Sequence, residues 1–328
     1  MRAATITRPG GPDVLEVRDV PKPAPREHQV LVRVHASALN RADVLQRMGR
    51  YPAPPGVPAD IPGLEVAGVV EALGAHATRW SVRDRVFGIV AGGGNAEYAA
   101  VPETELARIP PELSFEDAAA LPEAFITSHD ALITQAAMRP GETVLIHAVG
   151  SGVGLAAVQL VRAFGGHCYG TARTAAKIER SKAFGLTEGV VIDDDPTVFI
   201  DASKRWTGGR GLDVILDLVG GSYLAADVEA AAPLGRIILI GLLAGRSATL
   251  NLGTILSRRL FLRGTVLRSR PASEKAAATN AFARDVLPLL ERGDVQPIVD
   301  RVIPLEQIRE AHALLESNQT FGKIVLRH

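Results

Sequence analysis

A glycine-rich turn is the part of this sequence best suited to bind a ligand. Residues 143–154 read Thr-Val-Leu-Ile-His-Ala-Val-Gly-Ser-Gly-Val-Gly, which predicts a buried strand, a turn and a helix. Glycines let the backbone approach a pyrophosphate, and the helix N-terminus offers unpaired N–H groups at the positive end of its dipole. The residues expected to bind a dinucleotide here are Gly150, Ser151, Gly152 and Val153. The Gly-x-Gly-x-x-Gly pattern is incomplete, and such turns can also serve packing alone.

The end of the second expected strand indicates which dinucleotide binds. Enzymes that use NAD usually place Asp or Glu there, to accept a hydrogen bond from the ribose 2′-hydroxyl. Residues 170–177 contain no acid, and they offer positive charge from Arg173 and Lys177 and a hydroxyl from Thr171. This pattern favours NADPH. Arginine is far more frequent than lysine throughout the chain, so one arginine here also has a compositional explanation.

Strand-like and helix-like segments alternate around this turn. Apolar runs occur at 144–146, 167–172, 189–192, 214–219, 236–242 and 260–267, with helical segments at 175–184, 196–206 and 223–231 between them. This alternation predicts right-handed βαβ units and a doubly wound parallel sheet of the Rossmann type, in an α/β protein. Ligands of such sheets bind at the carboxyl ends of the strands. Two of these ends contain residues expected to leave room for a cofactor: Val219, Gly220 and Gly221, and Gly241, Leu242 and Leu243.

Length and composition are typical of a two-domain cytoplasmic enzyme. The chain has 328 residues, and 36 basic side chains balance 36 acidic ones, so no net charge favours nucleic acid or an anionic membrane. The single cysteine, Cys168, excludes an internal disulfide. The sequence contains no signal peptide and no apolar stretch long enough to span a bilayer.

The remainder of the chain predicts a second, mainly β domain. Residues 1–120 are rich in proline and β-branched residues, with strand-like runs at 29–36, 65–73 and 85–90. The C-terminal part predicts helices at 276–290 and 305–315 and strands at 298–303 and 323–326. The last strand is expected to return to the first domain. The dinucleotide domain, 123–263, is then inserted in a domain made of 1–122 and 264–328, with a ligand cleft between the two.

Short motifs along the whole chain resemble one protein family. They are SALNRAD at 37–43, QRxGxY at 46–51, GLE at 63–65, PEA at 122–124, SGVG at 151–154, DxxGG at 217–221, RG at 263–264 and GKIVL at 322–326. They resemble the zinc-free, zeta-crystallin-like quinone oxidoreductases of the medium-chain dehydrogenase/reductase superfamily. The similarity is greatest to the branch of the tumour-suppressor-induced quinone reductase. The resemblance implies a GroES-like catalytic domain with an inserted Rossmann domain.

The resemblance also implies an enzyme without metal. Zinc-dependent relatives have a catalytic Cys where Asn40 stands and a His where Leu64 stands, and their structural zinc needs four cysteines near residue 95. A tetrahedral zinc site needs three or four ligands held together. His35, His129 and His147 are scattered along the chain, and each is expected to be a packed or surface residue.

The family's functional residues map onto this sequence as follows. Asn40 and Thr127 are expected to hold the nicotinamide ribose and phosphate region. Gly241, Leu242 and Leu243 flank the nicotinamide, followed by Leu267 and Arg268, and Lys323 reaches the cofactor. Tyr51 is the candidate hydrogen-bond donor to the acceptor's oxygen, with a loop anchor among prolines as the alternative. Ser151 is expected to position the pyrophosphate or nicotinamide, so the candidate catalytic residues are Tyr51, Asn40 and Ser151. Asp193 departs from the family, because related reductases commonly have a tyrosine near this place, and an acid there weakens the NADPH prediction.

The sequence thus predicts an NADPH-dependent quinone oxidoreductase that transfers hydride without a metal. Two alternatives remain: an NADPH-dependent reductase of enoyl thioesters or other activated alkenes, and a non-catalytic, crystallin-like protein that binds NADPH. Fold alone does not separate them. A homodimer is expected through residues 260–267, because an edge strand exposes unpaired backbone groups and related reductases associate this way.

Overall fold

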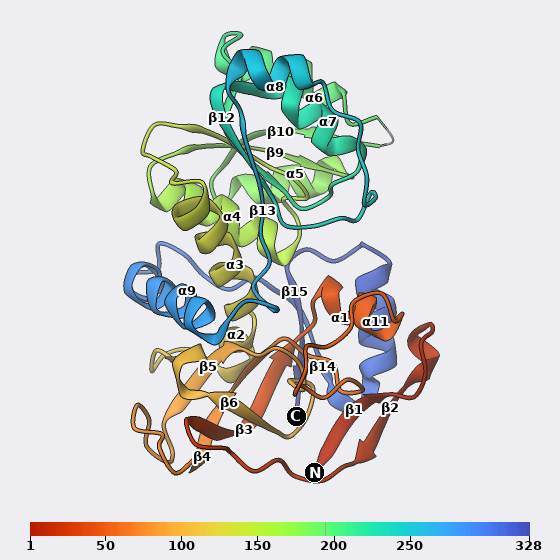
Figure 1. Ribbon diagram of the computed structural model, residues 1–328, viewed down its shortest axis with the longest axis vertical. Helices are drawn as coiled ribbons and strands as arrows, with labels where there is room; N and C mark the ends of the chain where they lie inside the picture. Colours follow the sequence, from red (N-terminus) through yellow and green to blue (C-terminus); the bar gives the residue numbers. More distant parts are fainter. Residues whose placement is uncertain (194) are drawn as a thin grey trace. The chain divides into compact units, whose positions relative to one another are not determined.

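The computed structural model describes residues 1–193 and 195–328, and the chain separates into two compact units (Figure 1). Unit 1 contains Met1–Ile126, Leu267–Glu291 and Gln296–His328, and unit 2 contains Thr127–Val266 and Arg292–Val295. Unit 2 is therefore almost entirely one continuous stretch of chain set between two parts of unit 1.

Unit 1 is built around a seven-stranded sheet. Its path runs β14-β15-β3-β4-β5-β7, and β6 also pairs with β3. The strands are β3 (Gln29–Ala38), β4 (Glu65–Leu73), β5 (Arg85–Ile89), β6 (Tyr98–Pro102), β7 (Leu106–Arg108), β14 (Val299–Pro304) and β15 (Lys323–Arg327). A separate hairpin pairs β1 (Arg2–Ile6) with β2 (Leu15–Asp19). Since β15 pairs with β3, the last strand does return to the first part of the chain, as the sequence predicted.

Short helices complete unit 1. They are α1 (Arg41–Arg47), α2 (Phe115–Ala119), α9 (Ala272–Asp285), α10 (Leu287–Glu291) and α11 (Ile308–Glu316), with a π-helical turn, η3 (Pro122–Ile126). The core inside the sheet is rich in valine, including Val30, Val32, Val66 and Val86. This agrees with the preference of β-branched side chains for the pleated surface.

Unit 2 is a parallel sheet of six strands in the order β10-β9-β8-β11-β12-β13. The strands are β8 (Thr143–Ile146), β9 (His167–Ala172), β10 (Leu186–Val191), β11 (Leu212–Asp217), β12 (Ala231–Leu239) and β13 (Phe261–Gly264). Every pairing is parallel. In chain order this is 3-2-1-4-5-6, the strand order of the Rossmann fold. The central strand β8 is buried at every position, because helices cover both faces of the sheet.

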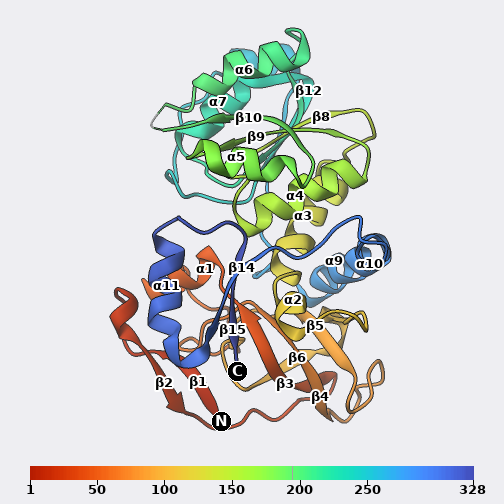
Figure 2. The ribbon, with the colours of Figure 1, turned by 180° about the vertical axis from the view of Figure 1, so that it is seen from behind.

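The helices of unit 2 lie in two layers. They are α3 (Thr127–His129), α4 (Gly152–Ala163), α5 (Ala175–Lys182), α6 (Val198–Thr207), α7 (Ser222–Ala230) and α8 (Leu252–Arg258), with a π-helical segment, η4 (Asp130–Gln135). Helices α4 and α5 lie on one side of β9 and β10, and α6 and α7 lie on the other, as both views show (Figures 1 and 2). The predicted doubly wound α/β fold is therefore confirmed.

Some element boundaries differ from the sequence prediction for identifiable reasons. Strand β11 ends at Asp217, two residues early, because its Oδ1 accepts the N–H groups of Val219 and Gly220 and turns the chain. The helix expected at 276–290 is two helices, and the second has Pro288 in its first turn, a position that tolerates proline. Helix α8 was not predicted, and it buries none of its residues.

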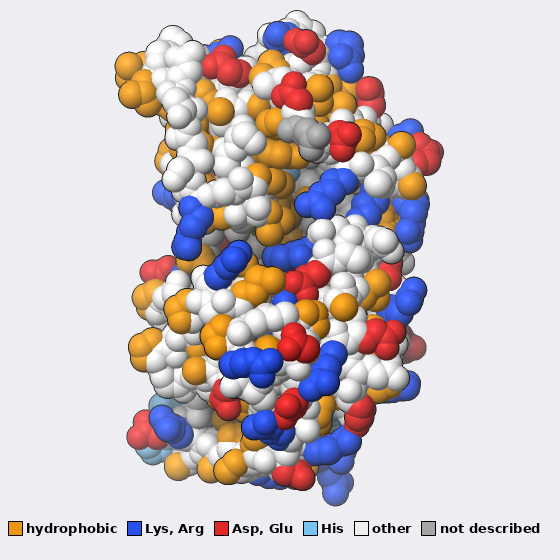
Figure 3. All heavy atoms as spheres, turned by 90° about the vertical axis from the view of Figure 1, so that its right-hand side faces the viewer, with side chains coloured by type: hydrophobic (Ala, Val, Ile, Leu, Met, Phe, Trp, Pro, Cys, Tyr) orange, Lys and Arg blue, Asp and Glu red, His pale blue; other side chains and the backbone are white. Residues whose placement is uncertain are grey.

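Charged side chains of both signs lie on one face of the molecule (Figure 3). On the face drawn in Figure 3, positively and negatively charged side chains are interspersed, in keeping with the equal numbers in the sequence. Within residues 1–193 and 195–328, no helix combines the length and the hydropathy needed to cross a membrane.

Candidate active site

The turn between β8 and α4 has the geometry of an anion-binding loop. Ala148 adopts a positive φ of 52°, and Ser151 caps α4 by accepting the N–H of Gly154 at 3.0 Å. A Cβ on Gly154 would lie 2.3 Å from the Ala148 carbonyl oxygen, so only glycine fits this position. The next N–H groups of the first turn, at Gly152 and Val153, have no acceptor inside the helix. The Ser151 oxygen is thus a helix cap, and a direct role in catalysis stays a prediction.

Two positive side chains lie near the same turn. Lys177 of α5 packs its methylenes over Gly150, where a Cβ would come within 2.8 Å of the lysine Cδ. Arg173 follows β9 directly and is exposed, and no hydrogen bond holds its guanidinium within the part of the chain that the structure describes. Asp193, the acid that weakens the NADPH prediction, is also exposed. The second strand therefore ends beside the turn with positive charge and no carboxylate of its own.

The glycines that follow β11 and β12 have a different surrounding from the one the sequence predicted. The glycines there were expected to leave room for a cofactor. A Cβ on Gly241 would lie 2.1 Å from the Leu218 carbonyl oxygen, and one on Gly220 would lie 2.8 Å from the Gly241 carbonyl oxygen. Backbone fills these spaces, so the glycines allow two chain segments to touch. Leu242 and Leu243 are instead 46% and 48% exposed, which leaves an apolar surface next to this contact.

These features of unit 2 fit a nicotinamide dinucleotide. Besides the loop and the positive charges, Thr127 has a buried hydroxyl oxygen with no hydrogen-bond partner, and such orphaned groups normally bond to water or a ligand. Val219 is half-buried and donates its N–H to Asp217. Thr171 does not expose its hydroxyl, because it is 2% exposed and its Oγ1 lies 2.9 Å from Nδ1 of His147.

A buried acid–histidine network lies directly beneath the turn. His147 Nε2 lies 2.8 Å from Oδ1 of Asp227, and Asp227 and Asp217 are both fully buried. Burial, with a smaller effect of the neighbouring Asp227, raises the pKa of Asp217 to about 6, and burial raises the pKa of Asp227 well above its usual value. Burial lowers the pKa of His147 to about 4. The two carboxyl groups therefore hold a proton beside a neutral imidazole, which satisfies their otherwise unpaired oxygens.

The same three residues form the one His/Asp group among the described residues with spacing suited to a metal, all ligand atoms lying within 4.8 Å. Both nitrogens of His147 and one oxygen of Asp217 already have partners in the protein. The hydrogen-bond network accounts for the cluster, and the absence of a metal stays a prediction.

In unit 1, Asn40 belongs to a buried network of polar side chains. Its Nδ2 donates to Oε1 of Glu65 at 2.8 Å, and its Oδ1 accepts from Nζ of Lys323 at 2.6 Å. The Lys323 ammonium also donates to the Leu39 carbonyl oxygen at 2.8 Å and forms an ion pair with Glu65 at 2.6 Å. All three ammonium protons thus have acceptors inside unit 1. Direct contact of Lys323 with a cofactor would require one of these interactions to break.

Tyr51 lies under the guanidinium of Arg268. The Arg268 Cζ is 4.8 Å from the centre of the tyrosine ring, and Nη1 donates to the Tyr51 carbonyl oxygen at 3.4 Å. Nε of the same arginine donates to the Ala91 carbonyl oxygen at 2.6 Å, and Nη2 to the side chain of Gln46. Burial raises the pKa of the Tyr51 phenol. Arg268, predicted from the family as a cofactor contact, therefore also fixes the Tyr51 loop.

Glu123 and Asp43 border this network, and the sequence prediction gave neither a role. Asp43 accepts the backbone N–H groups of Asn40 and Gly63, and burial raises its pKa to about 6. Glu123 donates its backbone N–H to Oε2 of Glu65 at 2.8 Å. Burial and the charge of Glu65 raise the pKa of the Glu123 carboxyl to about 8. The only sequence signal for Glu123 was its place in the PEA motif. Its position beside Glu65 is set by the tertiary structure.

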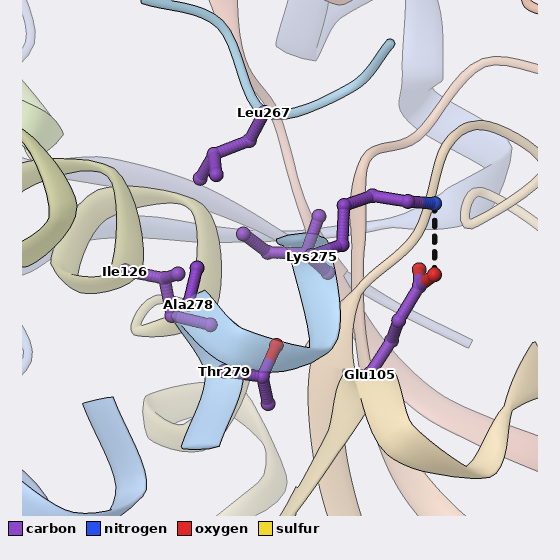
Figure 4. A pocket seen from close by; sticks show the side chains of 7 residues that line it. Glu105, Ile126, Leu267, Lys275, Ala278 and Thr279 are labelled. Carbon is purple, nitrogen blue, oxygen red and sulfur yellow. Dashed lines mark ion pairs between the residues drawn. The ribbon is translucent and has the colours of Figure 1, made fainter. Parts of the chain in front are cut away.

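An apolar cavity of unit 1 is too small to be the site. It is lined by Leu267 with Ile89, Ile126 and Ala278, and an ion pair between Glu105 and Lys275 (2.8 Å) borders it (Figure 4). Its volume is about 10 Å³, about the room of a single water. Leu267, predicted to follow the nicotinamide, is 7% exposed and faces this cavity (Figure 4).

The chain is similar to proteins of known name over its whole length. Residues 26–111 match the alcohol dehydrogenase GroES-like domain, and residues 186–326 match the zinc-binding dehydrogenase domain. A human quinone oxidoreductase is 33% identical, covering 99% of this chain and 97% of that protein. A mycobacterial protein solved as a complex with NADPH is 28% identical and superposes with a TM-score of 0.90, covering 100% of both chains. A structure named NAD-dependent alcohol dehydrogenase is 33% identical, with a TM-score of 0.86 and 100% coverage of both.

Proposed function

This chain belongs to the quinone oxidoreductase group of the medium-chain dehydrogenase/reductase superfamily, and we propose that it reduces quinones with NADPH without a metal ion. That it is an oxidoreductase with a nicotinamide cofactor follows from its family and its Rossmann sheet. The choice of NADPH, the quinone acceptor and the metal-free chemistry are the proposal. The membership in the tumour-suppressor-induced branch and a cytoplasmic location stay predictions.

The Lys323–Glu65–Asn40 network is the observation that carries this proposal. Asn40 stands where zinc-dependent relatives are expected to have their cysteine ligand, and an ammonium is bonded to it. The same ammonium neutralises Glu65, and Leu64, at the position of a histidine ligand, is 2% exposed and apolar. A divalent cation here would repel the lysine and find no thiolate or imidazole. Without a Lewis acid, an acceptor that is already electron-poor, such as a quinone, is the substrate of choice.

Unit 2 supplies the residues that would bind the cofactor. Gly152 and Val153 offer N–H groups to the pyrophosphate, and Arg173 and Lys177 offer charge to the adenosine 2′-phosphate. Leu242 and Leu243 offer an apolar surface for the nicotinamide. The nicotinamide, when bound, supplies the hydride. In unit 1, Asn40 and Lys323 hold each other rigidly, and the Tyr51 hydroxyl is available to orient the acceptor's oxygen.

A panel of acceptors tests the proposal. NADPH oxidation is followed with naphthoquinones, phenanthrenequinone, simple enones and enoyl thioesters, each also with NADH. We expect turnover with quinones and a lower KM for NADPH than for NADH. Reduction of enoyl thioesters with no reduction of quinones would replace the proposal by the alkene reductase. NADPH binding without turnover of any acceptor would indicate the non-catalytic, crystallin-like alternative.

We also propose that two copies associate through the β13 edge. The strand β13 has a free edge in the six-stranded sheet, and its Phe261 is 40% exposed. Helix α8, directly before it in the chain, buries none of its residues, and its Leu252 and Leu256 are 67% and 77% exposed. An unpaired edge strand beside exposed leucines is a surface that a second copy would cover by antiparallel pairing.

A further inference from the structure

Glu123 borders the buried polar network of unit 1, but the proposed function gives it no role. It lies in the π-helical turn η3, and its backbone N–H is held by Oε2 of Glu65 at 2.8 Å. Its side chain is half-buried, and its carboxyl group makes no hydrogen bond and no ion pair within the described residues. A π-helical turn of this kind often occurs at functional sites. Glu123 is therefore a fixed acid whose carboxyl group is available.

The surrounding charges leave one acid without a counter-charge. Five groups act on Glu123: Glu65 from β4, Lys323 from β15, Asp43 from α1, Arg268 after β13, and the Tyr51 phenol. Lys323 is paired with Glu65 at 2.6 Å. Arg268 donates to the Ala91 and Tyr51 carbonyl oxygens and to Gln46, all of them neutral. Three carboxyl groups thus share two cations, and among the described residues neither cation is paired with the Glu123 carboxyl group.

Of the three carboxyl groups, Glu123 is the one whose protonation costs the least free energy. Glu65 accepts two hydrogen bonds and pairs with Lys323, and Asp43 accepts two hydrogen bonds from backbone N–H groups. Hydrogen bonds to the charged form stabilise it. Glu123 has none, and partial burial together with the charge of Glu65 raises its pKa to about 8. The carboxyl group is therefore mostly neutral at pH 7 and can donate a proton.

We propose that Glu123 is the general acid that protonates the reduced acceptor, and that Tyr51 orients the acceptor. The proposal rests on the proposed quinone reduction, which adds one hydride and needs one proton. As the acceptor gains two electrons with the hydride, the O–H bond of the Glu123 carboxyl breaks and a new O–H bond forms on the acceptor's oxygen. Water then returns a proton to the carboxylate. Burial, and to a smaller extent the charge of Glu123, raises the pKa of the Tyr51 phenol.

The first test uses Glu123→Gln, which keeps the shape and loses the transferable proton. We expect kcat/KM for quinone to fall about a hundredfold, at the lower end of general acid catalysis because a quinone needs little activation. In the wild type kcat/KM should decline as the pH rises through about 8, since the neutral acid is lost. The variant should lack this decline. Glu123→Asp, which keeps a carboxyl group, should show the decline of kcat/KM at high pH. The matched control is Glu112→Gln at an exposed glutamate, which should leave kcat/KM and its pH profile unchanged.

Tyr51→Phe separates the two roles. It should lower turnover at most about tenfold, the value of one neutral hydrogen bond, and it should keep the decline at high pH. A Glu123→Gln enzyme that keeps the wild-type pH profile would overturn the proposal, whether or not its rate is lower, because the titrating acid would then be another group.

A second readout needs no acceptor. The infrared difference spectrum of wild type minus Glu123→Gln, recorded without substrate, should show the carbonyl band of a protonated carboxyl group that disappears between pH 7 and 9. Its absence at pH 7 would overturn the proposal. If the band is present but no quinone is reduced, the proposed function fails and the acid must serve another acceptor, so the two failures are distinguishable.

Discussion

At the scale of single residues, the central feature is the buried Lys323 ammonium, which is bonded to Asn40 and paired with Glu65. Lys323 has no free proton, because Leu39, Asn40 and Glu65 accept all three. The Asn40 amide in turn donates a hydrogen bond to Glu65 through its nitrogen and accepts one from Lys323 through its oxygen. These hydrogen bonds and the ion pair hold the three side chains in place. The proton-donating capacity lies at the border of the network, with Glu123 and Tyr51.

Arg173 and Lys177 should determine the choice of cofactor. Replacing both, as Arg173→Gln with Lys177→Met to keep the methylenes over Gly150, removes two charges from the place where we propose that the 2′-phosphate binds. We expect NADPH affinity to fall roughly ten- to a hundredfold, since one charged hydrogen bond is worth about 1.5–3 kcal/mol. NADH affinity should stay within a factor of two or so. Fluorescence titration with each cofactor measures both values.

The exposed Lys182→Met on the same helix is the control for this double variant. An equal loss of affinity for both cofactors would show that Arg173 and Lys177 are structural. A wild-type preference for NADH would mean that the exposed Asp193 outweighs them.

The sequence predicted the strand, turn and helix of the expected cofactor loop, but it did not predict the buried partners of Thr171 and Lys323. Gly150 to Val153 lie where expected, between β8 and the first turn of α4, because strand, turn and helix are encoded locally. The interior position of Thr171 depends on His147, 24 residues away, and that of Lys323 on Asn40, 283 residues away. Such pairings are set by tertiary structure, and one sequence contains no local signal for them.

At the scale of elements, the His147–Asp227–Asp217 network joins strands β8 and β11 to helix α7. Both acids have raised pKa values, so the folded protein binds more protons than the unfolded chain between about pH 4 and their folded pKa. Their contribution to stability is therefore full below about pH 4 and is lost as the pH rises through about 6 and beyond. His147, with its lowered pKa, acts in the opposite direction as the pH falls from 6.5 toward 4.

Asp227→Asn should reduce the loss of folding stability that occurs as the pH rises. The amide can donate to Asp217 and accept from His147 without adding a buried charge. We expect the free energy of unfolding of the variant, relative to wild type, to rise by roughly 2–3 kcal/mol from pH 4 to pH 8. Urea unfolding across this range measures it, with the exposed Asp193→Asn as control. A difference that does not change with pH would show that the pair carries no shared proton.

The sequence predicted which segments are strands and helices more reliably than it predicted where each of them ends. The six parallel strands have apolar runs that identify them, and β9 was predicted to the residue. The ends depend on side chains and backbone that approach from elsewhere, as at Asp217. Helix α8 was not predicted, and its Leu252 and Leu256 are exposed.

At the scale of the whole molecule, those leucines bear on the proposed dimer. Leu256→Glu places a charge on a helix that buries none of its residues, so the chain should still fold. We expect the wild type to be a dimer at micromolar concentration and the variant a monomer by light scattering. Val82→Glu, at a valine of unit 1 that is 51% exposed, is the matched control and should remain dimeric. A monomeric wild type would refute pairing through β13.

Whether the enzyme works without metal tests the account most directly. The measurement is NADPH oxidation with phenanthrenequinone in three samples: before dialysis against a strong chelator, after dialysis, and after dialysis with added zinc. The proposed metal-free reaction predicts the same turnover in all three samples and no oxidation of simple alcohols with NADP, because the Lys323 ammonium beside Asn40 and Glu65 would repel a divalent cation there. Activity that is lost on chelation and restored by zinc would contradict it.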